Sequence, residues 1–284
     1  MITPQLSQKT DALDRQLASI VVSHPRLMVL TGAGISTAAG LNDYRNKQGQ
    51  WKRQRPLTGQ VFVASESARK RYWARSSVGW PSFSLAQPAA SHFALREMQK
   101  SGIVQFLVTQ NVDRLHQKAG HQDVVDLHGA LETVSCIACS NTVSRDDFQI
   151  QLLDANSWLT SLSADYAPDG DADLELDSLE QMQIPDCPQC GNLLKPDVVF
   201  FGESVPRTKV QNSMQQLSAA DALLVAGSSL MVYSGYRFCK EAHQSGKPII
   251  IINDGVTRAD AIATIKVGGD CGSRLTTLAQ LSRR

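Results

Sequence analysis

The stretch "RLMVLTGAGISTAAGLNDYR", residues 26–45, decides the fold of this chain. Its apolar first part predicts a buried strand, and Gly32 and Gly34 predict a tight turn at the end of that strand. Glycines at this place let backbone N–H groups approach a pyrophosphate, which is how many nucleotide sites begin. A purely structural glycine turn would have the same sequence, so the stretch alone leaves the role of the turn open.

Three more apolar runs end in small or polar residues in the same way. They start at Ile103, Ala222 and Pro248 and end in TQNVD, GSSL and ND. Short runs without polar alternation are typical of parallel strands covered by helices on both faces, although a buried helix segment could also show this pattern. We therefore expect an α/β protein with a Rossmann-like parallel sheet, helices on both of its faces and ligands at the carboxyl ends of its strands. An amphipathic helix is expected before the first strand, over residues 6–21.

The composition is that of an ordinary soluble globular protein. The 284 residues are 42% hydrophobic and 19% charged, which is enough for a substantial core. The net charge of +1 gives no electrostatic reason to expect nucleic acid or an anionic membrane as a partner. No apolar run approaches the ~20 residues that span a bilayer. The N-terminal stretch has no secretory pattern, so a cytoplasmic location is expected.

Four of the six cysteines form two C-x-x-C pairs, CIAC and CPQC. Two such pairs predict one tetrahedral Zn²⁺ per chain, bound by Cys136, Cys139, Cys187 and Cys190. Four thiolates leave no open position for water, so the zinc is expected to be structural and to hold a small lobe together. A redox C-x-x-C pair or unrelated surface thiols are the alternatives.

An acidic stretch, ADYAPDGDADLELDSLE, occupies residues 164–180 between the two pairs and contains no Lys or Arg. It is expected to be an exposed insertion, and it argues against nucleic-acid binding by the zinc lobe. Its DGDAD segment resembles part of an EF-hand, but the required spacing and downstream Glu of a Ca²⁺ loop are not met.

Polar side chains after the second run could bind a carboxamide such as that of nicotinamide. Gln110, Asn111 and Asp113 could donate to and accept from such a group, while Asn111 or Asp113 could also cap a helix over residues 114–118. His128, in VVDLHG, is a candidate general base because the ordinary pKa of histidine lies near 7. Zinc ligation and core packing are the alternatives for His128 at this point.

The glycine turn does not match that of a hydride-transferring dehydrogenase. Thr37 occupies the place of the third glycine, and no obvious strand ending in Asp or Glu follows about 20 residues later to hold a ribose. The polar and aromatic stretch NDYRNKQGQW follows instead.

Taken together, these motifs resemble the sirtuin family of NAD-dependent protein deacylases. The resemblance covers residues 28–278 and rests on TGAGISTAAGLNDYR, TQNVD, DLHG, the paired cysteines, KPDVVFFGE, GSSL and IIND in this order. RYWARSSVGWPSF (residues 71–83), the acidic insertion and GSSLMVYSGYRF are most similar to the class II branch, which includes the mitochondrial lipoamidase and ADP-ribosyltransferase sirtuin. The resemblance implies that NAD⁺ is consumed as a co-substrate rather than used for hydride transfer.

In the family reaction, the carbonyl oxygen of an acyl-lysine attacks C1′ of the NAD⁺ ribose and nicotinamide leaves. The resemblance implies that His128 then deprotonates a ribose hydroxyl, which attacks the alkylimidate and leads to O-acyl-ADP-ribose. It also implies a set of NAD contacts: Gly32, Ala33, Gly34, Ile35, Ser36, Asp43, Tyr44, Arg45, Gln110, Asn111, Asp113, Gly227, Ser228, Ser229, Asn253, Asp254 and Cys271.

Two groups of residues are implied to bind an acyl-lysine protein or peptide. The first would pair with the peptide backbone as an added strand: Val199, Phe200, Phe201, Gly202 and Glu203. Tyr72 and Arg75 form the Tyr-x-x-Arg pattern of sirtuins that remove acidic acyl groups, and a guanidinium with a phenol could hold a carboxylate. A basic helix whose Tyr72 packs and whose arginines face water is the alternative.

Three positions depart from the family pattern, and one of them is Tyr44, where Phe is usual. Asn42 stands where Pro is usual, which favours a more mobile cofactor loop. Arg114 replaces the usual small residue after Asp113, and it could be a solvated side chain or could alter a channel near the nicotinamide pocket. We expect the solvated side chain.

The expected organisation is discontinuous. The Rossmann-like domain would comprise residues 1–45, 93–129 and 196–284. The cofactor loop and the helical part of the small lobe would span residues 46–92, and the zinc-binding lobe residues 130–195. Protein mono-ADP-ribosyltransferase is the alternative activity, because it would use the same cleavage of NAD⁺; a zinc-ribbon binding module without activity is a further alternative.

Overall fold

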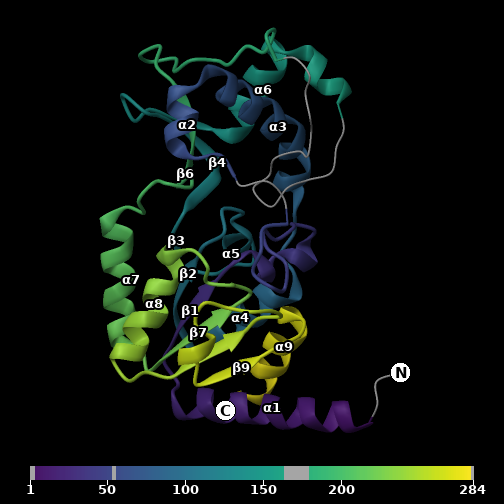
Figure 1. Cartoon of the computed structure of the whole chain (residues 1–284), viewed down its shortest axis with the longest axis vertical. Helices are drawn as coiled ribbons and strands as arrows, with labels where there is room; N and C mark the ends of the chain where they lie inside the picture. The colour runs from purple at the N-terminus through teal and green to yellow at the C-terminus, as the bar shows by residue number, and fades with distance from the viewer. Residues whose placement is uncertain (1–3, 53–55, 163–178, 283–284) are drawn as a thin grey trace.

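The four apolar runs form four adjacent strands of one parallel sheet. The computed structural model describes residues 4–52, 56–162 and 179–282, and its six-stranded sheet has the order β3-β2-β1-β7-β8-β9 (Figure 1). The strands are β1 (Leu27–Thr31), β2 (Val104–Thr109), β3 (Val124–Asp126), β7 (Ala222–Ala226), β8 (Ile249–Ile252) and β9 (Ile265–Val267). Every adjacent pair is parallel, which confirms the predicted fold class. Most of the predicted acidic insertion, residues 164–178, lies outside the described residues.

Helices cover both faces of this sheet, because successive strand residues point to opposite sides. Leu27 and Val29 pack on one face, whereas Met28 and Leu30 pack on the other. The first face is covered by α1 (Pro4–Ser23), α4 (Ala90–Lys100) and α9 (Cys271–Leu281), and the second by α7 (Arg207–Ala219) and α8 (Tyr233–Gln244). In Figure 1, α7 and α8 lie to the left of the sheet and α9 lies to its right. The helix predicted over residues 6–21 corresponds to α1, whose Leu17 is fully buried.

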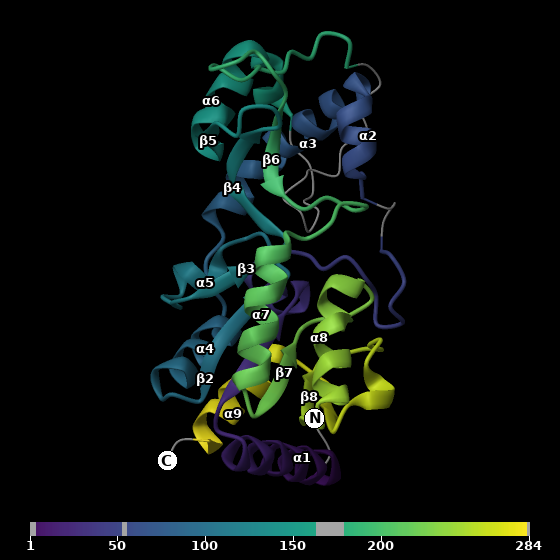
Figure 2. The same ribbon diagram turned by 90° about the vertical axis from the view of Figure 1, so that its left-hand side faces the viewer.

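A second, smaller lobe lies beyond the carboxyl ends of the parallel strands (Figures 1 and 2). It contains α2 (Gly59–Ala64), α3 (Glu66–Leu85), β4 (Gly129–Cys136), β5 (Thr142–Ser144), α6 (Arg145–Ala155) and β6 (Leu194–Val198). Its antiparallel sheet has the order β5-β4-β6. Phe62, Trp73 and Phe148 are fully buried in its core, and the ring centroids of Trp73 and Phe148 are 4.6 Å apart. Two separate parts of the chain therefore share one small core.

Short elements complete the described chain. The helix α5 (Leu115–Lys118) follows β2, and the 3₁₀ helices are η1 (Ala33–Ile35), η2 (Thr37–Ala39), η3 (Ser157–Ser161) and η4 (Asp260–Ile262). Among the described helices, none has both the length and the apolar character needed to cross a bilayer.

The register of the parallel sheet brings four strand ends to one level. Thr31 pairs with both Thr109 and Ala226, and Ala226 pairs with Ile252. The residues that follow these strands line one edge of the sheet, on the side of the smaller lobe: Gly32, Gln110, Gly227 and Asn253. This is the edge at which the sequence predicts ligand binding.

Candidate active site

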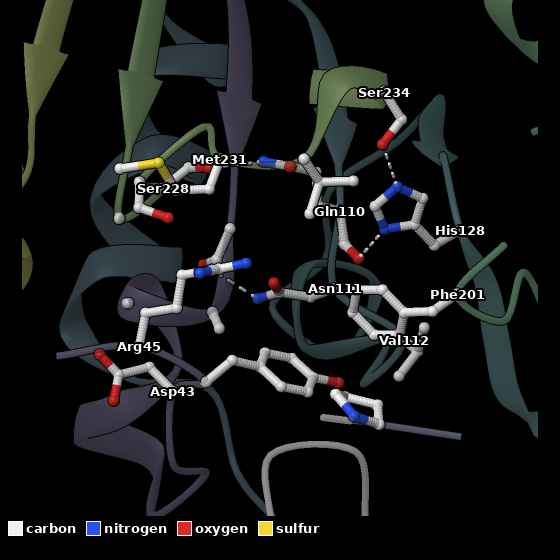
Figure 3. A pocket seen from close by; sticks show the side chains of 18 of the residues that line it. Asp43, Arg45, Gln110, Asn111, Val112, His128, Phe201, Ser228, Met231 and Ser234 are labelled. Atoms are coloured by element: carbon white, nitrogen blue, oxygen red, sulfur yellow. Dashed lines mark hydrogen bonds between the residues drawn. The ribbon is translucent and has the colours of Figure 1, made fainter. Parts of the chain in front are cut away.

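A cleft of about 1800 Å³ lies between the two lobes and contains the strand-end turns (Figure 3). All residues predicted to contact NAD or the acyl substrate line this cleft except Ile35. The Ile35 side chain is 1% exposed and lies in the core that α4 and α9 form with the sheet. The structure thus gathers residues that are far apart in the sequence, but it places the Ile35 side chain away from them.

The two glycine turns pack backbone against backbone. The Gly34 N–H donates to Gly227 O at 2.8 Å, and the Gly32 N–H donates to Ala226 O at 3.1 Å. Gly227 has φ +63°, and a Cβ atom added there would lie 2.7 Å from the carbonyl carbon of Gly34. After the first turn the chain forms η1 and η2 rather than an α-helix. The turn therefore differs from the dinucleotide motif in which the last glycine packs a helix against a strand.

Asn111, Ser36 and Asp113 form a buried hydrogen-bond network beside the first turn. The Asn111 Nδ2 donates to Ser36 Oγ at 3.0 Å and to Gly32 O at 3.2 Å, and Ser36 Oγ donates to Asp113 Oδ2 at 2.7 Å. Asp113 Oδ1 also accepts from the Leu115 N–H at 2.9 Å. Burial raises the pKa of Asp113, and these hydrogen bonds oppose the rise. The Asp113 carboxylate therefore accepts from the first backbone N–H of α5 and also from Ser36 in the hydrogen-bond network of the site.

His128 lies between β3 and β4, with both ring nitrogens hydrogen-bonded (Figure 3). Nδ1 is 2.9 Å from Gln110 O, and Nε2 is 2.8 Å from Ser234 Oγ. A carbonyl oxygen can only accept, so Nδ1 carries the hydrogen and Nε2 carries the lone pair of the neutral ring. Burial lowers the pKa of His128, and the charges of Lys209 and Arg237 lower it further, against the hydrogen bond to Gln110. The ring is therefore a neutral base at pH 7 that lines the cleft.

An aromatic group borders the cleft. The rings of Tyr44, Trp51 and Phe201 meet edge to face, with centroids 5.4 to 6.3 Å apart. The Arg45 guanidinium lies 3.8 Å from the centre of the Trp51 ring and donates to Gly49 O at 2.7 Å. Trp51 was not predicted as a site residue. Its aromatic character is visible in the sequence, but its contact with Phe201 arises only when the two lobes come together.

Two of the predicted carboxylates are paired with lysines of the cofactor loop. Lys47 Nζ is 2.7 Å from Asp254 Oδ2, and Lys52 forms an ion pair with Asp43. The Val256 N–H also donates to Lys47 O at 2.8 Å. The two Lys47 contacts attach the loop to the chain that follows β8, whereas the Lys52–Asp43 pair lies within the segment that contains the loop.

Tyr72 and Arg75 lie on α3 and line the cleft from the smaller lobe. Tyr72 is 6% exposed, and its ring packs edge to face against Phe62 and Phe200, with centroids 5.5 and 5.3 Å away. The packing expected in the basic-helix alternative therefore applies to the Tyr72 ring, whereas Arg75 places a cation beside the cleft.

The segment predicted to pair with the substrate peptide lies directly after β6. The Val199 N–H donates to His128 O at 2.8 Å, which joins this segment to the base. The chain then turns, with the Glu203 N–H donating to Phe200 O at 3.0 Å and the Phe200 N–H donating to Glu203 Oε2 at 2.8 Å. The segment lines the cleft, and its role in peptide binding stays a prediction.

The four predicted zinc ligands gather at one point of the smaller lobe. Their sulfur atoms all lie within 4.8 Å of one another, with Cys136 and Cys190 3.5 Å apart and Cys139 and Cys187 3.6 Å apart. Tetrahedral Zn–S bonds of about 2.3 Å require sulfur separations of about 3.8 Å, so this arrangement fits Zn²⁺. It is the only such group of candidate ligands in the described part of the chain, and His128 does not belong to it.

The structure also places residues that the sequence left undecided. Arg114 forms ion pairs with Asp126 and Glu132 and does not line the cleft, whereas Asn42 does. Four lining residues of α7 and α8 were not predicted: Arg207, Tyr233, Ser234 and Arg237. Their chemistry is visible in the sequence, but their direction depends on how each helix starts beside the cleft.

Comparison with known proteins identifies the family. The Sir2 family profile matches residues 32–234. An NAD-dependent protein deacetylase of Xanthomonas axonopodis pv. citri (strain 306) is 53% identical over 92% of this chain and 89% of that protein. The NAD-dependent protein deacylase Sirt4 of Drosophila melanogaster is 44% identical over 93% of this chain and 86% of that protein. A solved structure of Sir2 bound to an acetylated peptide has a TM-score of 0.75 at 27% identity, covering 94% of this chain and 97% of the solved chain. Because the profile matches more than half of the chain, including the turns after β1, β2 and β7, His128 and the cysteine cluster, and because the Xanthomonas and Drosophila proteins are at least 44% identical to it over most of its length, this chain belongs to the Sir2 family.

Proposed function

We propose that the cleft binds NAD⁺ together with an acyl-lysine peptide and that His128 is the base of the reaction. The family relationship makes the protein an NAD-dependent protein deacetylase, and the roles of individual residues are the proposal. One observation supports them most directly. A neutral histidine with its Nε2 lone pair lies in the same cleft as the two glycine turns and the Asn111 network.

The glycines serve close packing more than direct contact with phosphate. The N–H groups of Gly32 and Gly34 already donate to protein carbonyls, so they are not the donors that a pyrophosphate would use. Arg45 and Ser228, which line the same part of the cleft, would supply the cation and the hydroxyl instead. The Asn111 network would present fixed amide and carboxylate groups to the nicotinamide carboxamide.

His128 would act only in the second stage of the reaction. The first stage releases nicotinamide and needs no proton acceptor, whereas the transfer of the acyl group to the ribose requires a deprotonated hydroxyl. The Nε2 atom of His128 can take that proton, and Gln110 O then continues to accept from Nδ1. Well-placed bases of this kind contribute roughly 10²- to 10⁴-fold in rate.

We also infer a class II enzyme with a preference among acyl groups. The 44% identity to Drosophila Sirt4 supports the branch, and Arg75 supports an acyl chain that ends in a carboxylate. A guanidinium can bind a carboxylate by charge-assisted hydrogen bonds that an acetyl group cannot form. The buried Tyr72 ring would shape the wall next to it.

The acyl preference is tested by comparing Arg75→Met with Arg71→Met, an exposed arginine on the preceding turn of α3 that also lines the cleft. Succinyl and methylglutaryl peptides should lose more kcat/KM than acetyl and lipoyl peptides in Arg75→Met. If Arg75→Met keeps the full wild-type ranking of acyl groups, the assignment is wrong.

The activity itself is tested with NAD⁺ and the same peptide panel, followed by mass spectrometry of nicotinamide, O-acyl-ADP-ribose and peptide mass. His128→Tyr is the control, and it should lose deacylation. Nicotinamide release accompanied by ADP-ribose on protein, without loss of the peptide acyl group, would instead support the mono-ADP-ribosyltransferase alternative.

A further inference from the structure

Ser234 contacts the atom of His128 that must take up the proton. Its Oγ is 2.8 Å from Nε2, and Ser234 is only 8% exposed in the first turn of α8 (Figure 3). Because Nδ1–H donates to Gln110 O, the neutral Nε2 is an acceptor and the Ser234 hydroxyl is the donor. His128 is thus held at both nitrogens, from two different elements.

The two partners of His128 are themselves packed together. A Cβ atom added to Gly235 would lie 2.8 Å from Cδ of Gln110, so the start of α8 rests directly on the residue whose carbonyl holds Nδ1. The Gln110 side chain in turn donates to Ser228 Oγ at 2.7 Å and to Thr31 O at 3.2 Å. The position of Ser234 is therefore fixed by the carboxyl edge of the parallel sheet, not by a surface loop.

We propose that Ser234 is a positioning residue that keeps Nε2 of His128 directed at the cleft and accepts a hydrogen bond from the ring once it is protonated. A hydroxyl can exchange roles by rotating about its C–O bond. The Ser234 hydrogen turns away from the Nε2 lone pair when the ribose hydroxyl donates to that lone pair. The Ser234 oxygen stays next to Nε2 and accepts from the new N–H bond. The proton itself moves from the ribose oxygen to Nε2, so the step is balanced without another reactant.

Positive charges near His128 make this role of Ser234 important. Lys209 of α7 and Arg237 of α8 act on the ring with positive charge, which disfavours a second cation there. An oxygen acceptor next to Nε2 offsets part of that cost, and a hydrogen bond to a charged group is stronger than one to a neutral group. Removal of the Ser234 hydroxyl should therefore destabilise the protonated His128 ring more than the neutral ring.

The test compares two reactions of the same enzyme in Ser234→Ala and Ser234→Thr. This inference rests on the proposed role of His128 as the base. The first stage, the release of nicotinamide, needs no base, so its rate is the internal reference. Exchange of labelled nicotinamide into NAD⁺ in the presence of an acetyl-lysine peptide reports the first stage, and formation of deacetylated peptide reports the second. Ser245→Ala, an exposed serine directly after α8, is the matched control, and His128→Tyr is the reference for a lost base.

We expect Ser234→Ala to lower kcat for deacetylation by about 10- to 100-fold while nicotinamide exchange changes far less. The acid limb of the kcat/KM profile should move to lower pH, because the protonated ring loses its acceptor. Ser234→Thr, which keeps the hydroxyl, should recover most of the lost rate, and Ser245→Ala should match the wild type.

Two results would overturn the inference in an active enzyme: equal losses of exchange and deacetylation in Ser234→Ala, which would indicate a structural role, or no loss of deacetylation at all. If the wild-type protein catalyses neither reaction, the proposed function fails and this inference fails with it. A wild type that performs both reactions separates the two cases.

Discussion

The packing of the two glycine turns predicts that Gly227→Ala damages both folding and NAD⁺ binding. An alanine Cβ at this position would overlap the backbone nitrogen of Ile35 and lie 2.7 Å from the carbonyl carbon of Gly34. Both are main-chain atoms in a turn that is hydrogen-bonded to Gly227, so neither can rotate away. The two turns must therefore separate. Both turns line the cleft, so their separation changes its shape.

Gly246, just after α8, gives a matched control. Its φ of +68° is close to the +63° of Gly227, but no atom lies within 4 Å of an added Cβ. Both substitutions force alanine into the left-handed region, at a cost of about 1–2 kcal/mol. Only Gly227→Ala adds steric overlap, for which overpacking costs about 1–3 kcal/mol. We therefore expect Gly227→Ala to lower the free energy of unfolding by about 2–5 kcal/mol and Gly246→Ala by about 1–2 kcal/mol.

Urea unfolding followed by circular dichroism measures the two free energies, and calorimetric titration measures the Kd for NAD⁺. Gly246→Ala should bind NAD⁺ like the wild type, whereas Gly227→Ala should bind it more weakly. Equal destabilisation of the two variants, together with wild-type NAD⁺ affinity in Gly227→Ala, would refute the argument that backbone contact between the turns builds the site.

Three further predictions concern zinc and pH. Cys187→Ser should lose the zinc that Cys239→Ser retains, because Cys239 is buried in α8 outside the cysteine cluster; atomic emission spectroscopy of the purified variants decides this. Burial lowers the pKa of His128, and the neutral ring is the active form. Activity should therefore persist to lower pH than a solvent-exposed histidine allows. An acid limb of the kcat/KM profile at or above pH ~6.5 would contradict this prediction. Burial lowers the pKa of His92 and of His121 to about 4, below the ~6.5 of an unfolded chain. The unfolded state then binds more protons between these values, so stability should fall as pH drops from about 6.5 to about 4. His121→Gln should flatten that slope in urea unfolding at a series of pH values.

The large sheet could be predicted from the sequence because its central strands are continuous apolar runs. Residues 27–31 and 249–252, for example, are buried along their whole length, and a short run without polar alternation is typical of a parallel strand covered on both faces. The edge strands β3 and β9 have three residues each, which is too short for a periodic signal. The carboxyl ends of parallel strands lie at the same edge of a sheet, so the sequence also indicated that the turns after these strands would meet.

Side-chain directions could not be predicted in the same way. The sequence shows a serine at position 234 and a tryptophan at position 51, but the contact of Ser234 with His128 depends on the placement of α8. Ile35 shows the converse: the family resemblance placed it among the NAD contacts, whereas in η1 its side chain lies in the core. Tertiary packing, which a linear pattern does not contain, decides each of these cases.

The same packing connects the zinc cluster to the base. β4 begins at Gly129, directly after His128, and ends at Cys136, so one strand joins the two sites. Its pairing with β6 extends from Gly129 opposite Val198 to Cys136 opposite Leu194, and the hydrogen bond from the Val199 N–H to His128 O continues that ladder. The glycine turns, in contrast, are held by the parallel sheet of the other lobe. Loss of zinc should loosen the ladder that holds the backbone of His128 but leave the contact between the turns intact. We therefore expect zinc removal to abolish deacetylation with a much smaller effect on NAD⁺ affinity, so that a structural metal acts on catalysis through the position of the base.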